Sequence, residues 1–114
     1  MLFRSIRDGF VLRHDPREVT SEIQPIEGAF LACSLWLADA YVLCGEVDKA
    51  QVLFERVVAV ANDLGLLAEE YDSSAGRQTG NFPQALTHIA LINTAHNLSE
   101  AKHADDKPAM QRSK

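Results

Sequence analysis

The sequence predicts an all-α fold of about three main helices preceded by a helical stub at the N-terminus. Three observations predict this fold. Residues 29–44 are apolar on almost every side of a helix, residues 48–61 place apolar side chains at helical spacing on one side only, and Pro83 opens a third segment with an apolar side.

The N-terminal region is expected to hold only short elements. Residues 1–7 are interpreted as the end of a helix, which is the stub. Asp8 and Gly9 predict a turn, and residues 10–12 are expected to be extended. A polar loop then leads to Glu27.

The first main helix is predicted over residues 29–44. Its side chains are apolar on almost every face, so Phe30 and Trp36 are interpreted as core residues. Gly45 is expected just past the helix end, where a left-handed backbone favours glycine. A helix that is apolar on every face must be surrounded by other elements.

The second main helix is predicted to be amphipathic. Asp48 has the position of an N-cap with Gln51 three residues on, and Val47 could pack against Val52 as a hydrophobic staple. The apolar side is formed by Ala50, Leu53, Phe54, Val57, Val58 and Ala61. The connection from the first helix is short, which predicts two antiparallel neighbours.

A long loop is expected over residues 65–81, with an acidic cluster of Glu69, Glu70 and Asp72. Loops of this length in a compact domain are uncommon and are usually functional or disordered. The third helix should begin at Pro83 and end near residue 98. Residues 99–114 are expected to form a charged, disordered tail.

The composition predicts a single globular domain in 114 residues, and the net charge of −5 argues against a nucleic-acid partner. The most apolar stretch, residues 29–44, is shorter than the roughly 20 residues that a membrane span needs. Cys33 and Cys44 lie on one predicted helix, about 16 Å apart at 1.5 Å per residue, which is too far for a disulfide. Two thiols that do not pair with each other indicate a reducing compartment, so we expect a cytoplasmic protein without a membrane partner.

Three helices and a stub cannot cover a helix that is apolar on every face. Each large apolar side chain left in water forgoes about 1.5–3 kcal/mol, whereas a whole domain is stable by only about 5–15 kcal/mol. Either self-association or the remainder of a larger helical protein must therefore cover the exposed side. The sequence is interpreted as a piece of a larger protein.

Three blocks of sequence carry a resemblance to a known family. They are EGAFLACSLWLADAY over residues 27–41, LLAEEYD over residues 66–72 and GNFPQALTHIALIN over residues 80–93. In this order they closely resemble the C-terminal end of glycoside hydrolase family 15, which contains glucoamylases, glucodextranases and a group of trehalases. The similarity extends from Ser5 to Leu98.

The resemblance implies that residues 1–98 form the C-terminal arc of an (α/α)6 barrel, the catalytic domain of the family. The first main helix would be an inner helix and the second an outer helix. The implied function is that of a fragment of an inverting, exo-acting α-glucoside hydrolase. Its substrate in the complete enzyme would be trehalose or a maltodextrin-type glucoside, and no cofactor is implied.

The resemblance also implies a catalytic role for Glu69. Inverting glycosidases use one carboxylic acid and one carboxylate about 6.5–9.5 Å apart, with the carboxylate activating a water. The family's general base lies in an Ala-Glu-(Gln/Glu)-(Tyr/Phe)-Asp pattern, which residues 68–72 match. Glu69 is therefore the candidate base. The family's general acid lies on an earlier segment that this sequence lacks, so the chain alone is expected to be inactive, unless a complementing N-terminal chain supplies the acid.

Three further residues are candidate substrate contacts, namely Glu27, Glu70 and Tyr71. Glu27 could instead only complement the dipole of the following helix. The family often has an aromatic residue followed by Ser-His where this chain has Leu86, Thr87 and His88. Because Leu86 is not aromatic, no sugar-stacking contact is predicted at this position.

No metal site is predicted from the four histidines. His88 and His96 lie about two helical turns apart, and no cysteine or acid completes a ligand set. His88 is interpreted instead as a hydrogen-bonded helix residue.

A helical-repeat interaction module is the alternative interpretation. Tyr41, Ala50 and Phe54 have the spacing of a tetratricopeptide repeat, with a turn between the two helices. Only one such unit is present, whereas about three repeats are needed for stability. A module of this kind would bind an extended peptide and catalyse nothing.

Overall fold

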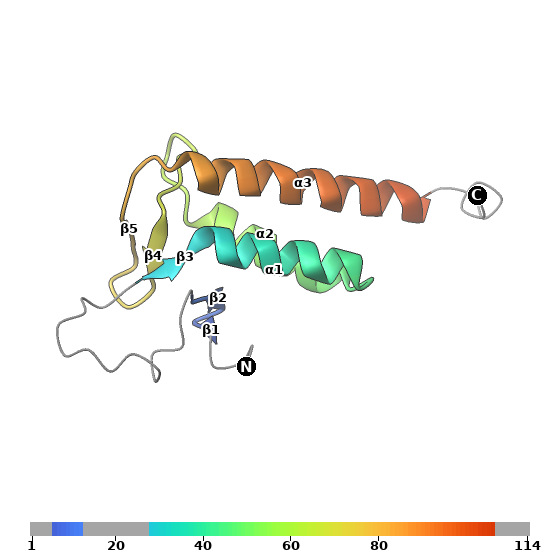
Figure 1. The fold of residues 1–114 in the computed structure, drawn as a ribbon, viewed down its shortest axis with the longest axis horizontal. Helices are drawn as coiled ribbons and strands as arrows, with labels where there is room; N and C mark the ends of the chain where they lie inside the picture. The colour runs from blue at the N-terminus through green and yellow to red at the C-terminus, as the bar shows by residue number, and fades with distance from the viewer. Residues whose placement is uncertain (1–5, 13–27, 107–114) are drawn as a thin grey trace.

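The computed structural model describes residues 6–12 and 28–106, and it is mostly helical (Figure 1). The elements in chain order are β1 (Ile6–Arg7), β2 (Phe10–Val11), β3 (Ala29–Phe30), α1 (Leu31–Leu43), α2 (Val47–Ala59), β4 (Glu70–Asp72), β5 (Arg77–Thr79) and α3 (Ala85–Asp106). Within these residues, none of the helices has both the length and the apolar character that crossing a membrane requires.

The three helices pack side by side, with a small sheet at one end. α1 and α3 both start next to the sheet and run away from it in the same direction, while α2 returns antiparallel to α1 (Figure 1). The sheet is antiparallel in the order β3-β4-β5. This arrangement brings the start of α1, the start of α3 and the sheet together at one end of the molecule.

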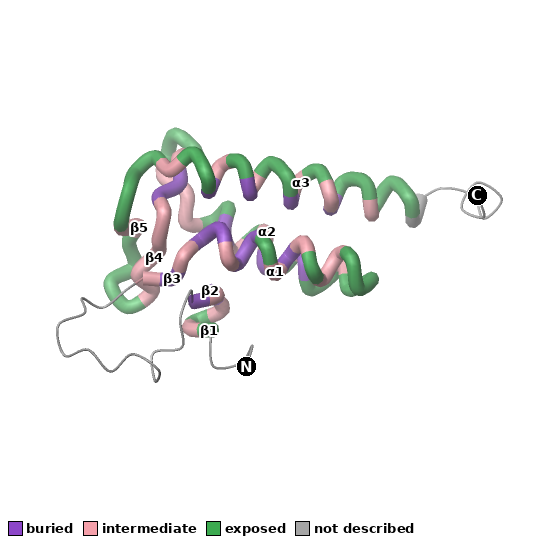
Figure 2. The backbone as a smooth tube through the Cα atoms, viewed as in Figure 1, coloured by how far each residue is buried: buried purple, intermediate pink, exposed green. Residues whose placement is uncertain are grey.

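The core is formed where the three helices meet. Leu31, Leu35, Val57 and Leu67 are fully buried near the sheet, and a second cluster of Ala38, Ala50, Leu53 and Leu98 continues the core toward the far ends of the helices. Figure 2 shows that the buried residues of α3 lie on the side facing the other two helices, whereas its opposite side is exposed.

The N-terminal stub is a hairpin rather than a helix, so that prediction is wrong for residues 6 and 7. β1 pairs with β2 across the predicted turn at Asp8 and Gly9, where φ is 52° and 84°. A two-residue hairpin turn of type I′ requires positive φ at both central residues, as found here. The hairpin is held to α2 by Arg56, whose Nη1 donates to the Gly9 carbonyl over 2.9 Å. Residues 1–5 lie outside the described part of the chain.

The helix boundaries differ from the predicted ones for identifiable reasons. α1 starts at Leu31 because the two residues before it pair with β4. Gly45 lies just past its end with φ of 79°, as predicted. The predicted capping box of α2 is wrong, since Glu46 is the N-cap residue, without a side-chain cap bond, and Asp48 lies in the first turn, where its charge suits the helix dipole.

Two further predictions are corrected in the second half of the chain. The expected loop over residues 65–81 contains the β4–β5 hairpin. α3 begins at Ala85 rather than at Pro83, and it continues to Asp106. Residues 99–106 are therefore helical instead of belonging to a disordered tail, and residues 107–114 lie outside the described part.

The chain leaves large apolar side chains in water, as the excess of apolar surface predicted. Trp36 on α1, which was expected in the core, is 50% exposed, and Leu43 is 88% exposed. On α3, Ile89 and Ile92 are 57% and 67% exposed. The three helices thus cover only part of the apolar surface that α1 and α3 carry.

Candidate active site

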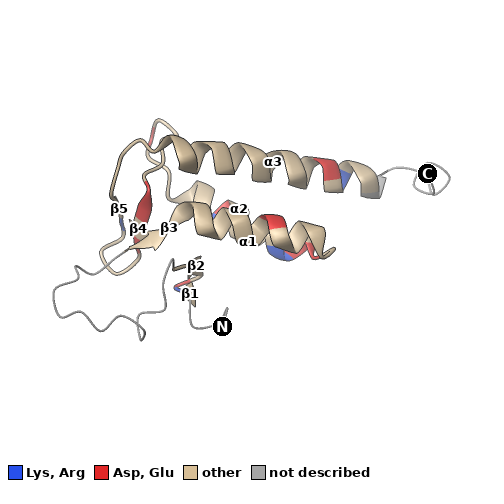
Figure 3. Ribbon diagram, viewed as in Figure 1, with Lys and Arg blue, Asp and Glu red and all other residues tan. Residues whose placement is uncertain are grey.

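Glu69 lies at the end of the molecule where α1 and α3 begin. Its carbonyl accepts a hydrogen bond of 3.0 Å from the amide of Leu31, the first residue of α1, and its own amide donates to the Asn81 carbonyl over 2.9 Å. The residue is half-buried. Figure 3 shows that the strand β4, which follows Glu69 directly, carries acidic residues at this same end. Both backbone groups of Glu69 are therefore fixed, one to the start of α1 and one to the connection that leads into α3.

The first turns of α3 hold the two residues that precede Glu69. The Leu67 carbonyl accepts from the Gln84 amide over 2.9 Å, and the Leu67 amide donates to Nε2 of His88 over 3.1 Å. The buried hydroxyl of Thr87 donates to the Ala68 carbonyl over 3.0 Å. The prediction that His88 is a hydrogen-bonded helix residue is confirmed. Because Nε2 accepts this bond, the ring must carry its proton on Nδ1 when neutral.

The remaining backbone groups of this segment are bonded to Gln78 and Asn62. The Leu66 amide donates to Oδ1 of Asn62 over 2.8 Å. The Gln78 side chain donates through Nε2 to the Leu66 carbonyl over 3.2 Å and accepts from the Ala68 amide through Oε1. Every backbone amide and carbonyl from residue 66 to residue 69 thus has a partner, although the segment belongs to no helix or strand. Buried polar groups of a loop need such partners, and here they define one conformation.

Gly80 provides the space that the Glu69 side chain occupies. A Cβ atom at this position would lie 3.1 Å from Cβ of Glu69 and 3.2 Å from Oε2 of Glu70. The φ of Gly80 is 79°, a conformation that glycine adopts more readily than other residues. Both acidic side chains therefore lie against this glycine, and the position has no room for a larger residue.

The other predicted site residues are distributed over the sheet. Glu70 pairs with Phe30 and Thr79, whereas Tyr71 is the next residue of β4 and so points to the opposite face. The Tyr71 ring packs against the buried Phe10 ring, with 5.0 Å between the centroids. Tyr71 therefore has a packing role, and its predicted contact with a sugar, like that of Glu70, stays a prediction. Glu27 lies outside the described residues.

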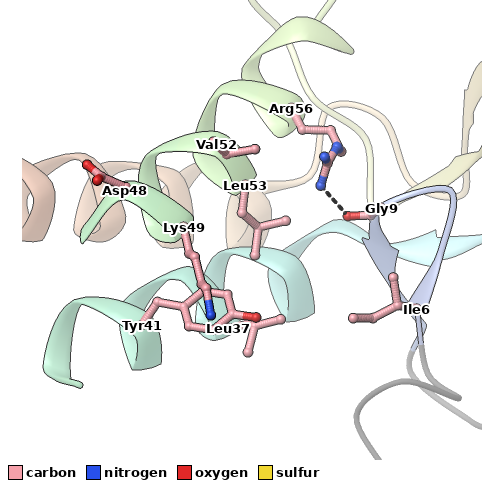
Figure 4. A pocket seen from close by; sticks show the side chains of 9 residues that line it. All are labelled: Ile6, Gly9, Leu37, Tyr41, Asp48, Lys49, Val52, Leu53 and Arg56. Carbon is pink, nitrogen blue, oxygen red and sulfur yellow. Dashed lines mark hydrogen bonds between the residues drawn. The ribbon is translucent and has the colours of Figure 1, made fainter. Parts of the chain in front are cut away.

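A separate hollow of about 340 Å³ opens between the β1–β2 hairpin, α1 and α2 (Figure 4). Its lining is mostly apolar, with Leu37 and Leu53 near the centre and Arg56 at the hairpin side. None of the predicted site residues lines it. The hollow and the Glu69 segment are therefore distinct features.

Sequence reasoning missed Gln78 and Asn81 as residues that hold this segment. Both act on backbone groups 10 or more positions away in the chain, so no local pattern indicates them. Gly80 offered a partial signal, because glycine is favoured where two backbone segments approach closely.

Comparison with known proteins identifies the family. The model of glycosyl hydrolases family 15 matches residues 5–96. A trehalase of Mycobacterium tuberculosis is 44% identical over 103 residues, which are 90% of this chain and 15% of that protein. Trehalases of Mycolicibacterium smegmatis and Thermoplasma acidophilum are 43% and 36% identical over 87% and 88% of this chain, again 15% of their own lengths. No solved structure gives a significant match.

The chain belongs to glycoside hydrolase family 15, and it spans about 15% of the length of the relatives named above. The predicted family is thereby confirmed. The family match covers both helices of the single predicted tetratricopeptide unit, so the alternative of an interaction module receives no support.

Proposed function

We propose that this chain forms the C-terminal part of an inverting hydrolase that acts on trehalose, with Glu69 as its general base. The observation that carries the proposal is the fixed position of Glu69. Its backbone is bonded to the start of α1 and to the segment before α3, and its side chain lies against Gly80. The names of the relatives favour trehalose over the maltodextrin-type substrates that the sequence left open.

The proposed reaction breaks one of the two bonds to the oxygen that joins the two glucose units. The ionised carboxylate of Glu69 takes a proton from a water, and the water oxygen bonds to the anomeric carbon on the face opposite the breaking bond. A carboxylic acid on the other side gives its proton to the bridging oxygen as that bond breaks. One glucose leaves with inverted, β configuration, and the other keeps its α configuration.

The general acid of this mechanism would come from outside this chain. The chain corresponds to only 15% of the length of its relatives, and the resemblance assigns the acid to an earlier segment. General acid or base assistance contributes about 10²–10⁴-fold each. The isolated chain should therefore release no measurable glucose.

The helix directions are those that an arc of an (α/α)6 barrel requires. Inner helices of such a barrel run parallel to each other and outer helices run antiparallel to them, which would make α1 and α3 inner helices and α2 an outer one (Figure 1). The exposed side chains of Trp36, Ile89 and Ile92 would then be covered by the rest of the barrel. Full burial contributes up to about 1.5–3 kcal/mol for each such side chain.

A chimeric enzyme tests the proposal. The segment of the Mycobacterium tuberculosis trehalase that matches this chain is replaced by the residues of this chain, and glucose release from trehalose is measured. We expect activity, with equal amounts of α- and β-glucose seen by NMR before mutarotation. Glu69→Gln should lower kcat by about 10²–10⁴-fold. Glu55→Gln makes the same chemical change at an exposed position of α2 and serves as the matched control, which should retain the activity of the parent chimera.

Two results would contradict the proposal. A Glu69→Gln chimera as active as the parent chimera would show that Glu69 is not the base. Release of α-glucose alone would exclude an inverting mechanism.

A further inference from the structure

We propose that Gln78 is a positioning residue for Glu69, an inference that rests on the proposed function of Glu69 as the base. One carboxamide bonds the chain on both sides of Leu67. Its Nε2 donates to the Leu66 carbonyl over 3.2 Å, and its Oε1 accepts from the amide of Ala68, the residue directly before Glu69.

The position of Gln78 in the sheet aims its side chain at this segment. Gln78 is the partner of Tyr71 across β4 and β5, and Tyr71 is in turn the partner of the buried Ala29 across β3 and β4. Cross-strand partners point to the same face of a sheet. Gln78 thus lies at the end of a row that faces the core, and from there its half-buried side chain reaches the segment before β4.

Both the oxygen and the nitrogen of the Gln78 carboxamide are needed, because they bond to different backbone groups. The amide of Ala68 lacks an acceptor without Oε1, and the peptide that contains it also contains the Leu67 carbonyl, which Gln84 fixes. With both ends of one peptide held, its plane cannot rotate, and the backbone enters Glu69 in one direction. A carboxylate in place of the carboxamide would keep the acceptor but would point a negative oxygen at the Leu66 carbonyl.

The strand β5 and the two residues after it thus act on Glu69 at three places. Gln78 fixes the Leu67–Ala68 peptide one residue earlier, Gly80 leaves space for the Glu69 side chain, and the Asn81 carbonyl accepts from the Glu69 amide. The β4–β5 hairpin, for which the sequence predicts a loop, would then set the direction in which the Glu69 side chain points. A displacement of about 1 Å between a catalytic group and its target costs about 10²-fold in rate.

The first experiment measures amide hydrogen exchange by NMR in the 114-residue chain itself. Gln78→Met has a side chain of similar length without hydrogen-bonding groups. It should speed exchange of the Ala68 and Glu69 amides at least tenfold and leave the amides of α1 and α2 within about twofold of their parent rates. Gln78→Glu should leave the Ala68 amide more protected than Gln78→Met does. Gln51→Met makes the same chemical change on the exposed side of α2, where Gln51 bonds to Glu55, and should leave the Ala68 and Glu69 amides unchanged.

The second experiment measures kcat and KM of the chimeric enzyme with the same variants. A positioning role predicts that Gln78→Met lowers kcat about 10- to 100-fold with KM changed less than threefold, and that Gln78→Glu restores part of kcat. A merely structural role would instead lower the protection of all amides together and the yield of folded enzyme, with kcat per folded molecule unchanged.

Each outcome decides the matter. Unchanged Ala68 exchange in Gln78→Met, or an equal loss of protection throughout the helices, would overturn the proposal, and so would local loosening with unaltered kcat. If the parent chimera is inactive, the proposed function fails by itself, and the exchange rates still determine whether Gln78 fixes the Leu67–Ala68 peptide.

Discussion

Replacing Gly80 by alanine should disturb Glu69 directly. The added Cβ would lie 3.1 Å from Cβ of Glu69, whereas carbon atoms in good contact are about 3.5–4.0 Å apart. The Glu69 side chain must therefore move by about 0.4 Å or more. Since a 1 Å misplacement costs about 10²-fold, we expect kcat of the chimera to fall about three- to tenfold. Alanine at a φ of 79° adds backbone strain of about 1–2 kcal/mol.

Gly76 supplies a matched control for the backbone strain. Its φ is 66°, and a Cβ there would meet nothing within 4 Å. Gly76→Ala and Gly80→Ala should therefore both lower the urea midpoint of the isolated chain by about 0.5–1 M, while only Gly80→Ala should lower kcat. Equal kcat values for the two variants would refute the argument that Gly80 makes space for Glu69.

Three other predictions concern the support of the site, the hairpin and the open face. Thr87→Val should lower the free energy of unfolding by about 1–3 kcal/mol, because the buried Ala68 carbonyl loses its donor. Thr94→Val should lower it less, because the carbonyls that Thr94 contacts lie within helices. Urea unfolding of both variants checks this order. Arg56→Met should raise hydrogen exchange in the β1–β2 hairpin and leave α3 unaffected, because it removes the bond that holds the hairpin to α2. Ile92→Lys should change the stability of the isolated chain by less than about 0.5 kcal/mol yet abolish the activity of the chimera. Val58→Lys on α2, at a position that is also exposed, should leave the chimera active. An active Ile92→Lys chimera would show that the rest of the barrel does not cover this face.

Two of the three helices, α1 and α2, were predictable because each has a strong local signal, whereas both predicted ends of α3 were wrong. The apolar run of α1, the one-sided pattern of α2 and the glycine after α1 depend on residues close together in the chain. The short strands were not predictable in the same way. β3 holds only Ala29 and Phe30, which would continue the apolar pattern of α1, and they are extended because they pair with β4, some 40 residues later. Long-range pairing overrode the local preference at that point.

The site was predictable only in part, for a related reason. Glu69 stands in a short motif that the family resemblance made recognisable. The residues that fix its position act across the chain: the Gln78 side chain bonds to a peptide 10 positions earlier, and the Thr87 hydroxyl bonds to one 19 positions earlier. Such bonds depend on the packing of α3 and the sheet against the segment. A sequence pattern reports a residue that does chemistry more readily than the residues that hold it.

The chain combines a segment whose backbone groups are all hydrogen-bonded with a helix face whose apolar side chains are exposed. From residue 66 to residue 69 every backbone group is bonded within the chain. The partners belong to α1, α3, β5 and the loop residues Asn62, Asn81 and Gln84. The backbone of Glu69 is therefore fixed by bonds within the described part of the chain. The outer side of α3 is the opposite case, because Ile89 and Ile92 are more than half exposed and apolar groups of that size favour a partner. Assembly with the rest of a family 15 domain would thus bury the exposed side of α3. If Glu69 is the base, as we propose, assembly would also bring the general acid to a segment whose backbone is already fixed.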